Sequence, residues 1–153
     1  MTAQVGIAIL VGLAATVDDL MRRRIANWIP VAGLAGGLGW QIGQHGWRGG
    51  LEAIGGAVMG FAVFLIFYLL GGMGGGDVKL MAGFGALLGW SGILWAALWT
   101  SVAGGILAVG TLAWKGALRR IRGGKEQDGG HKESIPYAPA ITLGVWLSLV
   151  PKG

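Results

Sequence analysis

The sequence lacks several residue types on which common protein classes depend. None of its 153 residues is cysteine, which excludes a disulfide scaffold and a zinc site of the thiolate type. His45 and His131 are the two histidines, too few to favour a multi-histidine metal centre. Charged residues make up 12%, whereas soluble domains contain about 25%. The chain is therefore poor in the residues that cover a soluble surface.

Apolar residues and glycine fill the sequence instead. Hydrophobic residues account for 54%, and the mean hydropathy is +0.64, which excludes ordinary disorder. The 32 glycines follow no Gly-X-Y period and accompany only 4 prolines, so collagen is excluded as well. Glycine is frequent in transmembrane helices because it lets their backbones approach closely. This composition is typical of a small polytopic membrane protein.

The apolar segments predict a single all-α membrane-embedded domain over residues 1–153. A bilayer core takes about 20 apolar residues per helix. The first helix is expected to remain as a permanent span, because no basic region precedes it as in a signal peptide. The fourth and fifth helices can also be read as one apolar stretch broken at 89–92. The six expected helices cover about residues 2–18, 27–44, 51–71, 78–90, 92–114 and 135–151.

The basic residues indicate how these helices are oriented. With the N-terminus outside, ten of the twelve Lys and Arg residues fall in cytoplasmic segments, and only Arg48 and Lys152 fall outside. This distribution follows the positive-inside rule for six spans and returns the C-terminus to the periplasmic side. The net charge of +5 is then explained by topology and lipid headgroups. Nucleic-acid binding by the 115–132 run is a weak alternative and is not predicted.

Four acidic residues are candidates for chemistry, because a carboxylate at membrane depth usually faces a protein interior or a water-filled cavity. Asp18 and Asp19 end the first helix on the predicted cytoplasmic side, and Asp77 begins the fourth helix on that side. Carboxylates 58 positions apart are therefore expected at one membrane level. Glu52 belongs to the opposite side, where an acid in a first helical turn is favoured by the helix dipole.

Structural roles compete with a catalytic one for the two aspartates at this level. Asp19 is also expected to pair with the arginines at 22–24, and Asp77 to complement its helix start or to pair with Lys79. The glycine-rich run 71–76 favours the catalytic interpretation, since such a backbone lets an extended substrate lie beside Asp77. A phosphate-binding loop is disfavoured because the Lys-Ser/Thr ending is missing.

Paired carboxylates have a characteristic chemistry. Two like charges a few ångströms apart do not both ionise easily, so the pair shares one proton. The ionised member then acts as a general base on water, and the protonated member polarises the scissile carbonyl. This is the chemistry of aspartic proteolysis, which needs no metal and no cofactor.

Three ordered motifs resemble those of the bacterial type IV prepilin peptidases. Residues 19–27 resemble the D-x5-I-P-N segment of that family, with Ala26 in place of its proline. Residues 74–80 resemble its GxGD-V-K-L segment, and residues 135–144 its P-Y-x-P-A-x-x-x-G segment. The matching positions outside the aspartates are Asn27, Gly74, Gly76, Lys79, Pro136, Tyr137 and Pro139.

The resemblance implies an intramembrane aspartic endopeptidase of the bacterial inner membrane, with Asp19 and Asp77 as its catalytic pair. Such enzymes remove the leader from type IV prepilins and pseudopilins at the cytoplasmic face. Lys79 is expected to orient a carboxylate or to tune its acidity, and Tyr137 to anchor the interface or offer a hydroxyl to the site. Without the family's Cys-x-x-Cys insertion, the chain resembles its short branch linked with Flp/Tad pili, so N-methylation is not expected.

Two other functions stay open at this point. The GxGD element also occurs in presenilin-like and signal-peptide-peptidase-like proteases, and a small proton-coupled transporter also places carboxylates in helices. Transporters usually carry such groups near the midplane, whereas these acids lie at helix ends. Dimerisation is equally left open by the sequence.

Overall fold

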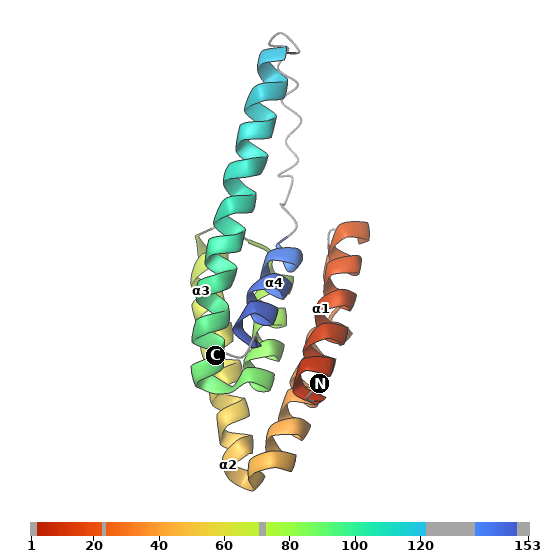
Figure 1. Ribbon diagram of the computed structural model, residues 1–153, viewed down its shortest axis with the longest axis vertical. Coiled ribbons are helices and arrows are strands. Elements are labelled where there is room, and N and C mark those ends of the chain that lie inside the picture. Colours follow the sequence, from red (N-terminus) through yellow and green to blue (C-terminus); the bar gives the residue numbers. More distant parts are fainter. Residues whose placement is uncertain (1–2, 23, 71–72, 122–136, 150–153) are drawn as a thin grey trace.

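The computed structural model describes residues 3–22, 24–70, 73–121 and 137–149, and within these ranges every regular element is a helix. This confirms the predicted all-α class. Apolar stretches long enough to cross a membrane occur in three of the helices, and the last helix is apolar but shorter. The elements are α1 (Ala3–Arg22), α2 (Trp28–Leu69), α3 (Gly75–Ile121) and α4 (Ala138–Leu149) (Figure 1).

Two of these helices reverse direction at a single glycine. Gly46 bends α2 with a φ of 59°, and Gly89 bends α3 with a φ of 70°. Glycine is required there because other residues rarely adopt a positive φ. Figure 1 shows the resulting V shape of α2. Each bent helix thus supplies two arms, so the described ranges contain six helical segments, as expected. Their number of membrane crossings and their orientation remain predictions.

The helix ends differ from the predicted ones around the acidic residues. α1 continues to Arg22, so Asp18 and Asp19 lie within the helix and not at its end. α3 begins at Gly75, before the predicted 78, and runs to Ile121, beyond the predicted 114. The expectation of an open glycine backbone is wrong for Gly75 and Gly76, which are helical with negative φ.

Close glycine contacts hold the first arm of α3 between the two arms of α2. A methyl group added at Gly56 would collide with the carbonyl of Gly85, and one added at Gly37 would meet the backbone of Leu87. Such approaches gain van der Waals contact where no hydrophobic driving force acts between helices. The glycines at these helix contacts include pairs spaced four residues apart, at 33/37 and 56/60.

A line of polar contacts sets the register between α1 and α4. The Thr142 hydroxyl donates to the Gly12 carbonyl at 3.2 Å and lies 3.1 Å from the Thr16 hydroxyl. The Trp146 indole N–H donates to the Ala8 carbonyl at 3.3 Å. Residue numbers along α1 decrease as the residue numbers of their partners along α4 increase, so the two helices are antiparallel. This register brings the start of α4 beside the last turns of α1.

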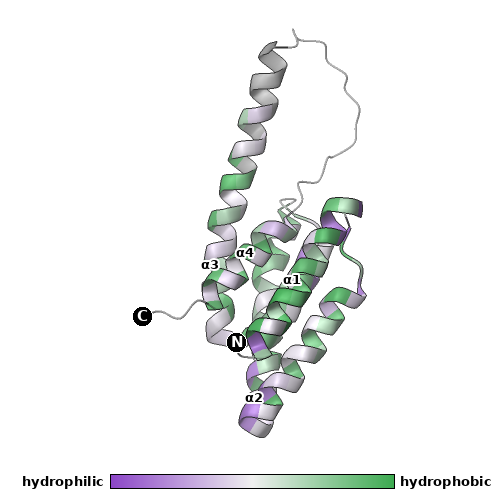
Figure 2. Cartoon of the chain, turned by 45° about the vertical axis from the view of Figure 1, so that its right-hand side comes forward, coloured by the Kyte–Doolittle hydropathy of each residue, from purple (hydrophilic) through white to green (hydrophobic). Residues whose placement is uncertain are grey.

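The outer surface of the bundle is apolar over most of its length. Large hydrophobic side chains are exposed on several helices, among them Leu10, Val31, Val58 and Ile106. Figure 2 shows hydrophilic residues at the bend of α2 and near the end of α1, with hydrophobic residues between. Soluble monomers rarely expose so much contiguous apolar surface. This distribution suits a protein surrounded by lipid.

Candidate active site

Two buried carboxylates come together at one end of the bundle. Asp19, in the last turns of α1, is 7% exposed, and Asp77, in the first turn of α3, is 6% exposed. They are the buried acidic side chains of the described residues, and the residues that precede their backbone donors, Met73 and Tyr137, line one pocket. Glu52 is exposed beside the Gly89 bend, at the other end of this arm of α3, as its assignment to the opposite side predicts.

A reciprocal pair of hydrogen bonds holds Asp77 against the glycine-rich segment. The Gly74 N–H donates to Asp77 Oδ2 at 3.1 Å, and the Asp77 N–H donates to the Gly74 carbonyl at 3.1 Å. Gly76 lies against Ile25, where an added Cβ would come within 3.1 Å of that side chain. The glycines thus contribute a backbone donor and a close helix contact, while the predicted passage for a peptide is not formed by Gly75 and Gly76. Residues 71–72 lie outside the described ranges.

Asp19 is held by the start of the last helix. The Ala138 N–H donates to Asp19 Oδ2 at 3.1 Å in a buried position, across 119 residues of sequence. A free N–H at a helix start is satisfied by a carboxylate, and the helix dipole favours a negative charge there. Pro139 follows in the first turn of α4, where its missing N–H costs nothing. Tyr137 is half-buried just before α4, and Pro136 lies outside the described residues.

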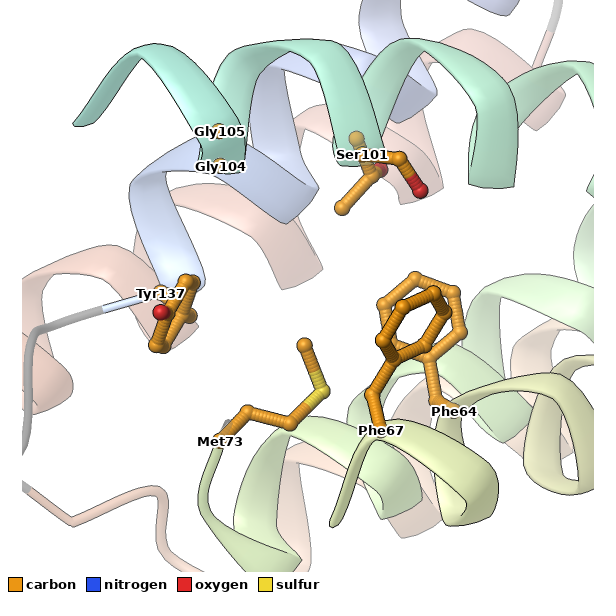
Figure 3. Close-up of a pocket in the computed structure, with 8 residues that line it drawn as sticks. Phe64, Phe67, Met73, Ser101, Gly104, Gly105 and Tyr137 are labelled. Carbon is orange, nitrogen blue, oxygen red and sulfur yellow. The ribbon is translucent and has the colours of Figure 1, made fainter. Parts of the chain in front are cut away.

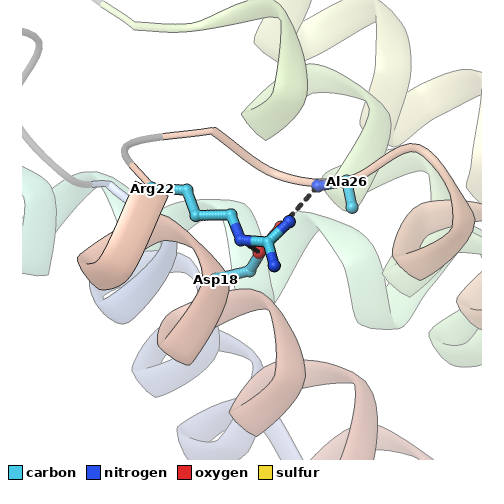
Figure 4. Close-up of polar contacts among 3 residues, drawn as sticks. All are labelled: Asp18, Arg22 and Ala26. Carbon is cyan, nitrogen blue, oxygen red and sulfur yellow. Dashed lines mark hydrogen bonds and ion pairs between the residues drawn. The ribbon is translucent and has the colours of Figure 1, made fainter.

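The neighbouring Asp18 has a different set of partners (Figure 4). Its Oδ2 accepts a hydrogen bond from the Ala26 N–H at 2.7 Å, and its Oδ1 lies 3.4 Å from Nε of Arg22. The pairing with an arginine that was expected for Asp19 is therefore made by Asp18. Asp18 closes the connection between α1 and α2 and leaves Asp19 to face the interior.

We expect Asp18→Ala to lower stability without abolishing catalysis. The substitution removes the acceptor of the Ala26 N–H, at a cost of about 1–2 kcal/mol for a partly buried charged acceptor. Asp18→Asn keeps an acceptor and should unfold at nearly the wild-type temperature. Thermal unfolding in detergent, measured beside substrate turnover, checks both expectations. Loss of turnover in the stable Asn variant would instead place Asp18 in the catalytic pair.

Lys79 and Asn27 form a link between two helices outside the carboxylate pair. The Lys79 ammonium donates to Asn27 Oδ1 at 3.1 Å in an exposed position. Asn27 precedes α2 and makes no side-chain capping bond. The hydrogen bond that Lys79 makes is thus to Asn27, which joins the start of α2 to α3. The predicted action of Lys79 on a carboxylate is not supported by this hydrogen bond, because its acceptor is an amide oxygen.

Sequence reasoning missed the groups that hold the carboxylates. The Gly74 and Ala138 donors are backbone amides, which leave no trace in residue type. The motif did single out Gly74, but the role predicted for it was conformational freedom and not the donation of a hydrogen bond to Asp77. Within the described ranges no group of three or more His, Cys, Asp or Glu side chains could hold a metal ion. What the arrangement offers is two buried acids, each oriented by one backbone amide.

Comparison with known proteins gives a consistent picture. The model of the type IV leader peptidase family matches residues 6–109. The prepilin leader peptidase/N-methyltransferase of Aeromonas hydrophila is 27% identical over 151 residues, covering 90% of this chain and 46% of that protein. The protein of the same name from Aeromonas salmonicida is 28% identical over 151 residues, with 90% and 45% covered.

A third relative matches a shorter region. The prepilin leader peptidase/N-methyltransferase of Burkholderia pseudomallei is 34% identical over 98 residues, covering 61% of this chain and 28% of that protein. The chain thus spans less than half the length of these curated relatives. No solved structure matches it significantly.

Proposed function

Because the chain belongs to the type IV leader peptidase family, we propose that it is an aspartic endopeptidase that removes the leader peptide from type IV prepilins or pseudopilins. One observation carries the aspartic mechanism. Asp19 and Asp77, far apart in sequence, are both buried at one end of the bundle, where the residues that precede their backbone donors line one pocket. Burying two neighbouring acids is costly, sharing one proton removes their repulsion, and ionisable groups retained inside a membrane protein usually serve a function.

The proposed mechanism uses the two carboxylates as base and acid. One ionised carboxylate removes a proton from a water molecule, which attacks the scissile carbonyl carbon. The other, protonated, donates to the carbonyl oxygen, and the proton later reaches the leaving amine as the peptide bond breaks. Hydrogen bonds from Gly74 and Ala138 fix the two carboxyl groups, so that little reorganisation is needed during the reaction.

The proposed substrate enters from the side of the bundle. A prepilin carries a basic leader followed by an apolar helix, and the exposed apolar faces of this protein support lateral docking of such a helix in the bilayer. Asp19 and Asp77 would then meet the junction between leader and helix. We place this end at the cytoplasmic face of the inner membrane, because the positive-inside rule assigns the loops near it to that side.

The branch of the family is also part of the proposal. The named relatives are leader peptidases and N-methyltransferases, whereas the sequence of 153 residues contains no cysteine and therefore no Cys-x-x-Cys pairs. We propose peptidase activity without methyl transfer, acting on Flp-like prepilins.

Co-expression with candidate prepilins tests this function. The wild-type chain should shorten a Flp-like prepilin by its leader mass, leave the new N-terminal amine unmethylated, and remain active in membranes treated with EDTA. An empty membrane preparation is the control. Failure to cleave Flp-like, other type IV and pseudopilin substrates, with the protein folded in the membrane, would refute the peptidase assignment. Loss of activity in EDTA would refute the metal-free mechanism.

A further inference from the structure

The Ala138 N–H that holds Asp19 belongs to a row of hydrogen bonds from α4 to α1. The three donors, Ala138, Thr142 and Trp146, are four residues apart and therefore lie on one face of α4. The first donates to the carboxylate, and the other two donate to backbone carbonyls of α1. The contacts that set the position of α4 along α1 thus also position the Ala138 N–H.

Thr142, the middle donor, is the most firmly placed of the three. Its side chain is 3% exposed, and its hydroxyl donates to the Gly12 carbonyl at 3.2 Å. The Thr16 hydroxyl lies 3.1 Å away and is the donor in that contact, because the single hydrogen of Thr142 is already used. A Cβ added at Gly12 would come within 2.6 Å of the Thr142 methyl group, so α1 has a glycine where this side chain packs.

This contact lies one helical turn from the carboxylate. Thr142 follows Ala138 by four residues, about 6 Å along the helix axis, and Thr16 precedes Asp19 by three, about 4.5 Å. Both contacts join the same two helices, so a shift of α4 along α1 changes them together. The bond from Ala138 to Asp19 measures 3.1 Å, and such bonds usually span about 2.7–3.2 Å. A small shift of α4 therefore weakens it.

The contact of α4 with α3 is close but offers no comparable directional restraint. A Cβ added at Gly144 would collide with the hydroxyl and backbone of Thr100. The Thr100 hydroxyl is buried and has no hydrogen-bond partner among the residues that the structure describes. This contact limits how closely α4 approaches α3, while the hydrogen bonds to α1 set its position along the bundle.

The start of α4 also borders open space. Tyr137, the residue before Ala138, lines the pocket that Met73 also lines, which has a volume of about 230 Å³. Figure 3 shows Tyr137 and Met73 on two sides of this space, with Phe67 beside it. Because the pocket is not filled by described side chains, packing on that side does not fix the first turn of α4. Its placement depends on the contacts with α1.

We propose that Thr142 is a positioning residue for the peptidase reaction, because its hydroxyl fixes α4 along α1 where the Ala138 N–H meets Asp19. The inference rests on the proposed function, in which Asp19 is one of the two reacting carboxylates. Thr142 acts through the backbone of α4, one turn away from the reacting group. Without its hydroxyl, α4 can slide along α1, and Asp19 loses the donor that orients it.

An isosteric substitution tests this role. Thr142→Val keeps the shape of the side chain and removes the hydroxyl. For a prepilin that the wild type cleaves, kcat should fall about 10- to 100-fold, the scale expected when a reacting group is misplaced by about 1 Å. KM should stay close to the wild-type value, because the lost interaction serves the reaction step. Thr142→Ser keeps the hydroxyl and should recover most of kcat. Timed mass analysis over a range of prepilin concentrations gives both constants.

Two matched controls separate positioning from general packing. Trp146→Phe removes the donor to the Ala8 carbonyl from the same face of α4, two turns from Ala138. It should lower the unfolding temperature in detergent but leave kcat near the wild-type value. Thr100→Val makes the same chemical change as Thr142→Val on the side of α4 that faces α3, where the hydroxyl has no partner. It should leave both kcat and the unfolding temperature close to those of the wild type.

Three results would overturn the positioning role: an unchanged kcat in Thr142→Val, an equal loss of kcat in Trp146→Phe, or no recovery in Thr142→Ser. If Thr142→Val does not fold, Thr16→Val decides, since it removes one of the two contacts of Thr142. It should lower kcat at unchanged KM, and an unchanged kcat in this folded variant would refute the proposal. A wild type that cleaves no prepilin would instead overturn the proposed function, and this inference with it.

Discussion

Asp77→Asn is expected to abolish leader cleavage while leaving the protein folded in the membrane. An asparagine oxygen still accepts the hydrogen bond from the Gly74 N–H, so the first turn of α3 keeps its contact. The amide neither takes a proton from water nor donates one as a carboxylic acid does. Turnover should fall by about a thousandfold or more, since the two carboxylates act as a unit. Mass analysis of the prepilin after timed incubation measures the loss.

Substitutions of Asp19 are expected to affect stability as well as turnover, and the effect on stability should differ between Asp19→Asn and Asp19→Ala. Asp19→Asn should lose turnover to the same extent but keep an acceptor for the Ala138 N–H. Asp19→Ala leaves that buried donor unsatisfied, at a cost of about 1–3 kcal/mol, and should loosen α4. Unfolding temperature in detergent, measured for both variants, distinguishes catalysis from packing. Turnover close to wild type in either Asn variant would exclude that residue from the catalytic pair.

The second large effect is expected at the contact between Gly56 and Gly85. Gly56→Ala or Gly85→Ala places a methyl group against the opposite carbonyl, which belongs to the backbone and does not rotate away. The two helix arms must separate, at a cost of about 1–3 kcal/mol or more. Thermal or denaturant unfolding in detergent should show this loss for each variant, and turnover should fall with it, because α3 carries Asp77.

Gly55→Ala provides the control for this contact. Gly55 is exposed, neighbours Gly56 on α2, and has no atom near the position of an added Cβ. Alanine should be neutral or slightly stabilising there, because glycine is a weaker helix former than alanine. Comparable losses of stability at 55 and 56 would show that helix flexibility, and not the close contact, determines the effect.

Much of the helical arrangement was predictable, because apolar length and glycine placement report directly on it. The break expected at 89–92 is the bend at Gly89, and the turn expected between 44 and 51 contains the bend at Gly46. Helix ends were predicted less well. The run before Asp77 was interpreted as an open backbone, whereas Gly76 packs against Ile25 and the helix begins at Gly75. Tertiary contact there overrides the weak helix propensity of glycine.

The carboxylates could be selected from the sequence, but their neighbours could not. Asp18 and Asp19 are adjacent and chemically identical, so only the rotation of α1 determines which one meets Arg22 and which one faces α4. The hydrogen bond from Lys79 to Asn27 likewise depends on the position of the start of α2, which the sequence does not reveal. Contacts between elements so distant in sequence leave no periodic signal, whereas motif resemblance had already indicated Asp19 and Asp77.

The hydrogen bond between Asp19 and Ala138 also has a consequence for biosynthesis. The chain is made from its N-terminus, so α1 and the segment with Asp77 leave the ribosome well before α4. Until α4 arrives, Asp19 has no buried donor and the end of the bundle that holds both acids lacks one wall. A partly synthesised chain therefore carries both carboxylates without their final geometry. The proposed peptidase activity is therefore expected only after α4 has been translated and has packed against α1.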